Sequence, residues 1–283
     1  MWKRLLAGIG GLVYVAAIVA MEVRRPLRRG KREPKLIRDV RNLSMAGLGA
    51  VTIQLLQDPI VRPLSRCVQQ RRWGLLQRRK LAAPLEIIAG VLLMDYTLYL
   101  WHVLTHRVPF LWRFHAAHHV DLDMDASTAI RFHFGELALS VPYRAAQVLF
   151  FGIAPRTLSV WQSFTFVSIL FHHSNIRLHE ALERRLQRLV VTPRLHGIHH
   201  SDVPTHANSN WSSGLTVWDF LHGTFRCDIP QSAITLGVSG IDQPQQVTLE
   251  RSLRMPFQPP DAIIQFVANA DGETESKTAT ASR

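Results

Sequence analysis

Cysteine is almost absent from this sequence, since only Cys67 and Cys227 occur among 283 residues. Two cysteines cannot build a disulfide framework, and without a C-x-x-C pair they cannot build a thiolate zinc site. Histidine, by contrast, occurs 14 times. Any metal chemistry in this chain must therefore come from imidazole and carboxylate groups.

Acidic residues are also scarce, at 21 against 33 lysines and arginines, which gives a formal net charge of +12. The basic residues concentrate in two short segments, with nine in residues 24–41 and seven in residues 62–80. No nucleic-acid recognition motif and no interleaved aromatic residues accompany them, which argues against a nucleic-acid partner. Both segments flank apolar stretches, so contact with anionic membrane lipids is the favoured interpretation.

Long apolar stretches predict an all-α polytopic membrane protein with about four transmembrane or re-entrant helices. The first, residues 5–21, precedes the basic sequence RRPLRRGKR, which favours a retained membrane anchor over a cleaved signal peptide. The second, residues 43–61, carries two glycines and two glutamines and either spans a membrane or lies partly in its interface. The third, residues 81–101, runs into histidines. The fourth, residues 137–171, is interpreted as two helices that meet at the sequence GIAP.

The third apolar stretch ends in DYTLYLWHVLTH, whose polar residues recur at helical spacing. Asp95, Tyr99, His102 and His106 fall at offsets of 0, 4, 7 and 11 residues, which is one stripe of a helix. His102 and His106, one turn apart, can ligate the same metal ion or neighbouring ions. Asp95 and Tyr99 are placed to orient such a ligand. The alternative is that His102 and His106 are ordinary buried histidines that bind no metal. Unpaired polar rings near lipid cost free energy, which makes this alternative less favourable.

Two further clusters repeat the pattern HxxHH. The first, HAAHH, supplies His115, His118 and His119, and the second, HGIHH, supplies His196, His199 and His200 after a helix-opening Pro193. Three imidazoles on one turn are crowded for packing alone, whereas neutral imidazole is a good donor to Fe, Zn or Cu. With the HxxxH pair the clusters give eight nitrogen donors, too many for one tetrahedral zinc, and they suit two ions.

Other histidines have less certain roles. The sequence FHHSN offers His172 and His173 as a ninth donor. His133 and His206 are candidates for supporting or substrate contacts, and His222 is left without a definite role. For the clusters to share a site, they must emerge on the same membrane face, so the apolar region between them must enter the membrane and return.

Taken together, the motifs resemble the fatty acid hydroxylase / sterol desaturase superfamily of membrane non-haem di-iron enzymes. The resemblance covers about half of the chain, roughly residues 92–226, in LLMDYTLYLWHVLTH, LWRFHAAHHVDLDMDASTAIRFHFGE, FHHSNIRL, VTPRLHGIHHS and HANSNWSSGLTVWDFLHGTF. It implies a mostly helical integral membrane protein, in a bacterial inner membrane or the endoplasmic reticulum, with a histidine-rich helical cap and a metal site facing the cytoplasm. It also implies O2-dependent hydroxylation, desaturation or ether cleavage of a lipid, with electrons from a separate reductase through a ferredoxin or a cytochrome.

The resemblance implies two iron ions, which zinc can replace in purified protein. The ligands that it implies are His102, His106, His115, His118, His119, His173, His196, His199 and His200. Residues at family positions of supporting or uncertain role are Asp95, His133, Glu136, Asn175, Asn210 and Asp219. The chain departs from some members in its short HxxxH spacing. It also lacks a histidine pair at i, i+4 before FHHSN, where Ser168 and Ile169 stand.

The expected organisation has four regions. Residues 1–80 form an N-terminal membrane-anchor region with basic loops, and residues 81–228 form the histidine-box catalytic domain. Residues 229–267 form an irregular segment, and residues 268–283 a disordered tail. Within the catalytic domain, residues 177–190 are expected to form an amphipathic helix that lies on a membrane, caps the site or covers a soluble lobe.

Two other functions use the same residues. A membrane-embedded zinc hydrolase would work without O2 or reductant and would need a carboxylate as general base. A non-catalytic metal-binding membrane protein would hold the ions without turnover.

Overall fold

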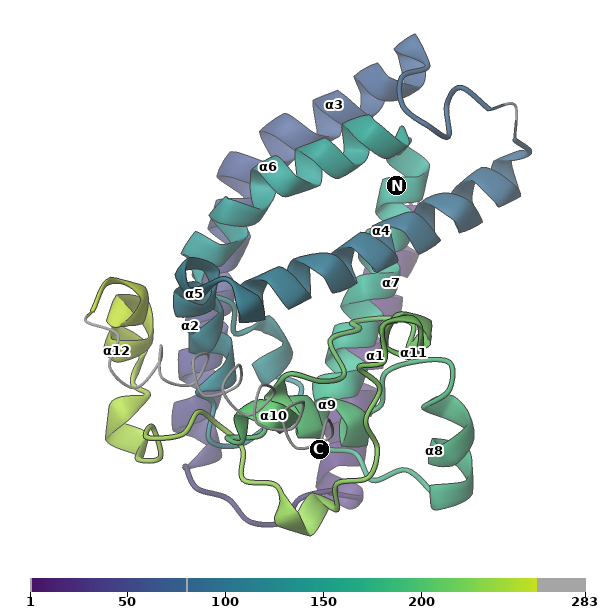
Figure 1. Ribbon diagram of the computed structural model, residues 1–283. Helices are drawn as coiled ribbons and strands as arrows, with labels where there is room; N and C mark the ends of the chain where they lie inside the picture. Colours follow the sequence, from purple (N-terminus) through teal and green to yellow (C-terminus); the bar gives the residue numbers. More distant parts are fainter. Residues whose placement is uncertain (1, 80, 259–283) are drawn as a thin grey trace, which may run out of the picture.

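The computed structural model describes residues 2–79 and 81–258, and in these residues helices and irregular segments account for the whole fold, with no strand beyond isolated bridges (Figure 1). The predicted all-α class is therefore confirmed. The α-helices are α1 (Trp2–Arg24), α2 (Lys35–Thr52), α3 (Asp58–Arg71), α4 (Ala83–Arg107), α5 (Pro109–His119), α6 (Phe134–Phe151), α7 (Pro155–His173), α8 (Glu180–Leu186), α9 (Pro193–His199), α10 (Pro204–Ala207), α11 (Val217–His222) and α12 (Leu249–Arg254). The short helical turns are η1 (Ile53–Gln57), η2 (Thr128–Ile130), η3 (Gln231–Ala233), η4 (Pro244–Gln246) and η5 (Met255–Phe257).

One long rod replaces two of the predicted segments. α2 and α3 continue into each other through η1, a stretch of π-helix, so residues 35–71 are helical without a break. The predicted apolar stretch 43–61 lies in the middle of this rod. The first half of the predicted basic loop 62–80 is also helical, as far as Arg71, although Pro63 lies inside this helix. The rod ends at Arg72, which adopts a left-handed conformation.

The predicted pair of helices in residues 137–171 is confirmed. α6 and α7 meet at Gly152–Ala154, where Gly152 has a φ of +75° that glycine adopts without strain. This turn nests against the loop after α3, since Leu75 N donates to Phe150 O at 3.0 Å. α3 packs along α6, and α4 packs along α7, around buried Met94 and Trp161.

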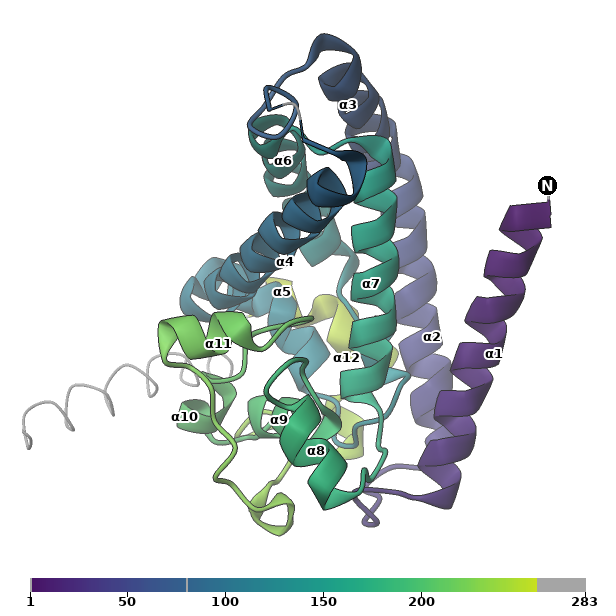
Figure 2. The ribbon, with the colours of Figure 1, turned by 90° about the vertical axis from the view of Figure 1, so that its right-hand side faces the viewer.

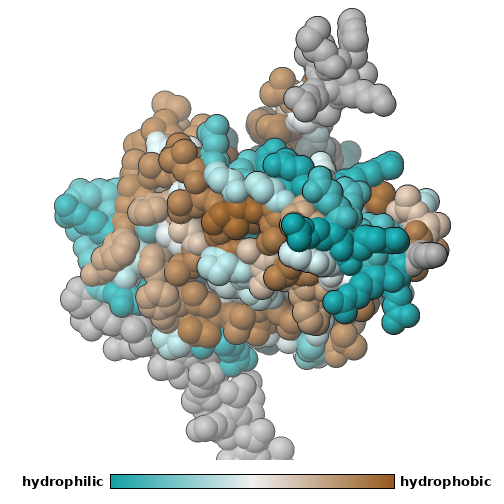
Figure 3. Space-filling model, turned by 90° about the horizontal axis from the view of Figure 1, so that it is seen from above, coloured by the Kyte–Doolittle hydropathy of each residue, from teal (hydrophilic) through white to brown (hydrophobic). Residues whose placement is uncertain are grey.

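The described helices that are long and apolar enough to cross a membrane are fewer than the four that the sequence suggested. Among the described residues, α4 is the one helix that is long and apolar enough to cross a membrane, so the count of about four spans is not confirmed. Large apolar side chains are nevertheless exposed along the rod, including Val51, Leu55 and Ile60. Figure 3 shows apolar side chains covering much of the upper end of the molecule, with a large group of hydrophilic residues on the right of the view and a smaller one on the left.

The opposite end carries the cap, formed by α8 to α11 and the connecting loops (Figures 1 and 2). α1 stands apart from the bundle at its N-terminal end and joins the cap end through residues 25–34 (Figure 2). The predicted amphipathic helix over 177–190 is shorter than expected, since α8 covers Glu180–Leu186. Leu182 and Leu189 of its apolar stripe are 49% and 65% exposed.

The described part of the C-terminal segment, residues 229–258, contains η3, η4, α12 and η5 joined by irregular chain. The predicted disordered tail, residues 268–283, lies outside the described residues.

Candidate metal centre

Four helices bring the histidines together at the junction of bundle and cap. α4 places His102 and His106 one turn apart on a buried face near its C-terminus. A single residue, Val108, separates α4 from α5, and Pro109 occupies the first position of α5, where no backbone N–H is needed. The two histidine-bearing helices are thereby joined almost without a loop.

α9 is short but its start is well defined. Thr192 caps its N-terminus by accepting a hydrogen bond from Leu195 N at 3.5 Å, and Pro193 opens the helix as the sequence predicted. His196 and His199 lie on α9, and His200 directly follows it. α7 contributes His172 and His173 from its last turn.

All nine histidines expected as ligands are buried, and they form two groups. In each group the nitrogen atoms that face one another lie within 4.8 Å. The first group is His102, His106, His115, His119 and His199, and the second is His118, His173, His196 and His200. Each HxxHH cluster is divided between the two groups, so α5 and α9 contribute to both.

Three rings of the first group are anchored through Nδ1. The contacts are His102 Nδ1 to Trp211 O at 2.6 Å, His115 Nδ1 to Glu136 Oε1 at 3.0 Å, and His199 Nδ1 to Ser209 O at 2.9 Å. Because a carbonyl or carboxylate oxygen only accepts, each Nδ1 carries the proton, and in a neutral ring Nε2 is left with a free lone pair. The Nε2 atoms of these three rings are buried with no hydrogen-bond partner among the described residues.

In the second group the ring nitrogens converge more tightly. His173 Nδ1 donates to Ile169 O at 2.8 Å, which leaves its Nε2 unprotonated in the neutral ring. That Nε2 lies 3.0 Å from His118 Nε2 and 2.9 Å from His196 Nε2. Three Nε2 atoms thus gather around one point. The two groups adjoin, since the rings of His119 and His200 stack with centroids 4.2 Å apart.

Burial favours the neutral form of the three rings at and after α9. Desolvation, followed by the effect of neighbouring histidines, lowers the pKa of His199 to about 3 and places the pKa values of His196 and His200 well below 6.5. A neutral imidazole is the form that binds a metal ion. Buried, neutral nitrogen donors with unpaired Nε2 atoms fit divalent first-row transition ions. Each of the two groups can therefore hold one metal ion.

The loop 209–212 holds the anchoring carbonyls in place, and Asp219 holds that loop. Asp219 Oδ1 accepts from Trp211 N at 2.9 Å and from Thr224 Oγ1 at 2.7 Å, while Oδ2 accepts from Ser212 N at 3.1 Å. Asn210 lies inside the loop with a φ of +52° and donates through Nδ2 to Leu195 O at 3.1 Å, which ties the loop to α9. Asp219 and Asn210 therefore act on His102 and His199 indirectly, by fixing the backbone carbonyls that these histidines contact.

Asp95 and Tyr99 lie on the buried face of α4, as expected, but their hydrogen bonds go to the cap instead of to a histidine. Asp95 Oδ2 accepts from Trp218 Nε1 at 2.7 Å and from Leu215 N at 3.1 Å. The Tyr99 hydroxyl lies 3.2 Å from Thr224 Oγ1. These contacts fix the segment around α11 on α4.

The remaining candidates lie outside the two groups. The ring of His172 is closest to the centre, with its centroid 4.0 Å from that of His196. His133 caps α6 by accepting from Gly135 N at 2.9 Å. His206 lies 3.3 Å from Ser201 Oγ, and His222 lies 3.2 Å from the Tyr96 hydroxyl. Asn175 bonds the backbone of Arg28 through both side-chain atoms, at 2.8 Å each.

Sequence reasoning did not identify Ser209 and Trp211 as partners of the histidines. Both act through their carbonyl oxygens, and a backbone carbonyl has no side-chain signature in a sequence. Their position depends on the path of the loop, which Asp219 and Asn210 fix. In the sequence, Asp219 and Asn210 were therefore the only indication that this loop supports the histidines.

A narrow cavity of about 170 Å3 leads to the histidines between α4, α6 and α7. Its walls combine apolar side chains with ring edges from both groups. The lining includes Leu98, Trp101, Phe132, Leu137, Ile169, His102, His115, His118, His173 and His196. The buried Arg144 also lines it, with its guanidinium 4.2 Å above the ring of Trp161.

A family model described as fatty acid hydroxylase matches residues 87–224, the part of the chain that carries both groups. Among similar proteins, the ornithine lipid hydroxylase OlsE of Rhizobium tropici is 31% identical over 156 residues, which is 55% of this chain and 46% of that protein. Alkylglycerol monooxygenase of Xenopus tropicalis is 27% identical over 132 residues, 47% of this chain and 28% of that protein.

Cholesterol 25-hydroxylase of Rattus norvegicus is 29% identical over 235 residues, 79% of this chain and 74% of that protein. The chain therefore spans less than half the length of the first two relatives and about three quarters of the third. No solved structure matches the chain.

Proposed function

We propose that this chain, whose residues 87–224 match a family model described as fatty acid hydroxylase, hydroxylates a C–H bond of a lipid with O2 at a centre of two iron ions. One observation carries the proposal: two adjoining groups of buried histidines direct unpaired nitrogens inward, beside a cavity between apolar helices. The names of the relatives, which are hydroxylases and monooxygenases, favour hydroxylation over desaturation.

In this proposal the nine histidines of the two groups hold the two ions. When bound, iron would activate O2 for the oxidation of a C–H bond, which no amino-acid side chain can do. The balance is one C–H bond, one O2, two electrons and two protons giving one C–OH group and one water. The two electrons must come from a separate donor, and we propose a reductase acting through a ferredoxin or a cytochrome.

The residues around the histidines orient and insulate the centre. Nδ1 contacts to Ser209 O, Trp211 O and Glu136 fix the tautomers so that lone pairs face inward. Glu136 is the one carboxylate that contacts a ligand among the described residues, and its charge offsets part of the charge that two divalent ions would bring. The nine rings are 8% exposed or less, so bulk water is excluded.

The cavity between α4, α6 and α7 gives the substrate its path. Its apolar walls fit part of a hydrocarbon chain, and the exposed apolar side chains of the bundle fit a membrane. We therefore propose an integral membrane enzyme in which a lipid chain passes between the helices and presents one carbon to the histidines. The cap then faces the cytoplasm, where soluble electron donors are found.

The test combines metal content with turnover. Protein purified without O2 should contain two irons per chain. It should convert a lipid substrate, found by screening membrane lipid extracts, only when O2 and an electron donor are both present. The matched control is His179→Ala, an exposed histidine outside both groups, which should keep both irons. Full turnover without O2 would instead support the zinc hydrolase.

A further inference from the structure

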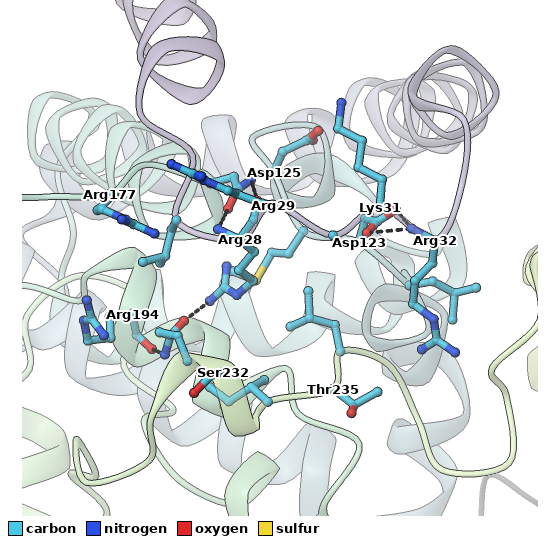
Figure 4. Close-up of a pocket in the computed structure, with 18 of the residues that line it drawn as sticks. Arg28, Arg29, Lys31, Arg32, Asp123, Asp125, Arg177, Arg194, Ser232 and Thr235 are labelled. Carbon is cyan, nitrogen blue, oxygen red and sulfur yellow. Dashed lines mark hydrogen bonds between the residues drawn. The ribbon is translucent and has the colours of Figure 1, made fainter.

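A second cavity, of about 920 Å3, lies on the cap behind α9 and away from the histidine cavity (Figure 4). It forms where the loop after α1 meets the chain before α8, the start of α9 and residues 230–236. The volume is that of about thirty water molecules, so the cavity holds much more than one small ion. Nothing in the proposed hydroxylation uses it.

The walls of this cavity are strongly basic. Eight arginines and lysines line it, against four carboxylates. The cations are Arg28, Arg29, Lys31, Arg32, Lys35, Arg38, Arg177 and Arg194. The carboxylates are largely engaged: Asp125 pairs with Lys35 and Arg38, Glu33 with Arg41, and Glu180 with Arg184, while Asp123 accepts from backbone amides.

Arg28 is the most constrained of these cations. Asn175 clamps its backbone from both sides, and its Nη2 donates to Gln231 Oε1 at 2.6 Å and to Pro193 O at 3.1 Å. Its Nε and Nη1 are sealed from solvent and have no partner among the described residues. Burial, and then the neighbouring charge of Arg194, lower the pKa of Arg28 to about 10. The Arg28 guanidinium is thus held in a fixed position by neutral hydrogen-bond acceptors, and it forms no ion pair within the described residues.

Three more arginines line the pocket with Arg28: its chain neighbour Arg29, and Arg177 and Arg194 from two other segments. Figure 4 shows Arg28, Arg29, Arg177 and Arg194 on one side of the pocket and Lys31 and Arg32 on the other. The side chains of Arg29 and Arg177 are exposed and form no hydrogen bond or ion pair with the described part of the chain. Glu183, behind the lining, offsets one of these charges, since its Oε2 lies 3.3 Å from Arg194 Nε. The cluster therefore carries a surplus of positive charge.

We propose that this pocket binds a phosphate group, either the headgroup of an anionic lipid or a soluble phosphate ester. Guanidinium groups present paired N–H donors that match phosphate oxygens, and a bound phosphate would neutralise the surplus charge of the cluster. Ser232 and Thr235 add hydroxyl groups to the same wall. The spare volume accommodates the rest of a headgroup or ester. The position directly after α1 is where an anchored helix would leave the lipid phase.

Occupancy of the pocket would also support the histidine-bearing helix. Arg28 packs so closely on α9 that a Cβ at Gly197 would collide with Arg28 Nη2. Gly197 is the neighbour of His196 on α9. A phosphate that neutralises the cluster therefore stabilises the contact between the loop after α1 and α9.

The test measures binding on the full, metal-loaded chain. In a nonionic detergent the protein is titrated with inorganic phosphate at constant ionic strength, and the heat of binding is recorded. In a second arm, thermal unfolding is compared in nanodiscs of phosphatidylcholine with and without phosphatidylglycerol. Binding of phosphate alone identifies a soluble ester as the source, whereas stabilisation by phosphatidylglycerol identifies a lipid.

The double variant Arg29→Gln/Arg177→Gln removes two side chains that hold no structure together. It should weaken phosphate binding about tenfold, or about 1.4 kcal/mol, and reduce stabilisation by phosphatidylglycerol, because two exposed charge pairs with the phosphate are lost. Arg188→Gln, an exposed arginine outside the pocket, should bind like the wild type. Equal binding by the double variant, or no response of the wild type to phosphate or to phosphatidylglycerol, overturns the proposal. Because turnover is not measured, such a failure leaves the proposed hydroxylation untouched.

Discussion

Replacing Asp219 by asparagine should weaken metal binding although Asp219 is not among the nine ligand histidines. Both of its carboxylate oxygens accept hydrogen bonds, from Trp211 N, Ser212 N and Thr224 Oγ1. Asparagine has nearly the same shape but replaces one acceptor oxygen by an NH2 group, which must then face an N–H or O–H donor. The loop 209–212 would shift, and with it the carbonyls that orient His102 and His199.

Outer partners of metal-bound histidines typically contribute 10- to 100-fold to metal affinity, or about 1.4–2.8 kcal/mol. We therefore expect Asp219→Asn to lower affinity by that factor at the first group of histidines. The assay is an anaerobic competition titration of ferrous iron against a chromophoric chelator, with thermal unfolding of each metal-free protein recorded separately. Asp228→Asn is the control, because the Asp228 side chain is 67% exposed and its one ion pair within the described residues is with Arg226. Wild-type affinity in Asp219→Asn would refute the role assigned to the loop.

Three further predictions concern the two groups of histidines and the buried carboxylates Asp121 and Asp125, which pair with cations of α2. His118→Ala and His199→Ala, one from each group, should each abolish turnover and remove about one metal ion, measured by elemental analysis beside His179→Ala. Asp121→Asn should lower the free energy of unfolding by about 3–5 kcal/mol in denaturant titrations. The reason is that the buried Arg41, Asn42 and Thr128 lose the carboxylate to which they donate. Burial raises the pKa of Asp125, but the neighbouring cations Arg38 and Lys35 outweigh burial and lower this pKa to about 2. The ionised Asp125 therefore stabilises the fold above its ordinary pKa of 3.8, and this stabilisation is lost as the pH falls toward 2. In Asp125→Asn, the free energy of unfolding should no longer show this fall between about pH 4 and pH 2.

The sequence could predict the parts of this fold that depend on local pattern. Helical spacing placed His102 and His106 on one buried face of α4, and the GIAP turn divided α6 from α7. Pro193 marked the start of α9. These features follow from proline and glycine geometry and from apolar periodicity, which neighbouring residues alone determine.

Other parts depend on contacts between distant segments. No local pattern divides each HxxHH cluster between two groups, because that division depends on how α5 and α9 face each other. The carbonyls of Ser209 and Trp211 meet histidine rings only after Asp219 has folded their loop. The basic run after α1 was interpreted as a membrane-facing segment, whereas its Arg28 reaches the back of α9 through the clamp of Asn175.

The source of the oxygen atom in the product tests the proposed function most directly. Iron-loaded protein is incubated with its lipid substrate and an electron donor under labelled 18O2 in ordinary water, and the product is analysed by mass spectrometry. The proposed hydroxylation predicts one 18O atom in each product molecule and no product without O2. A product whose new oxygen comes from water would contradict it.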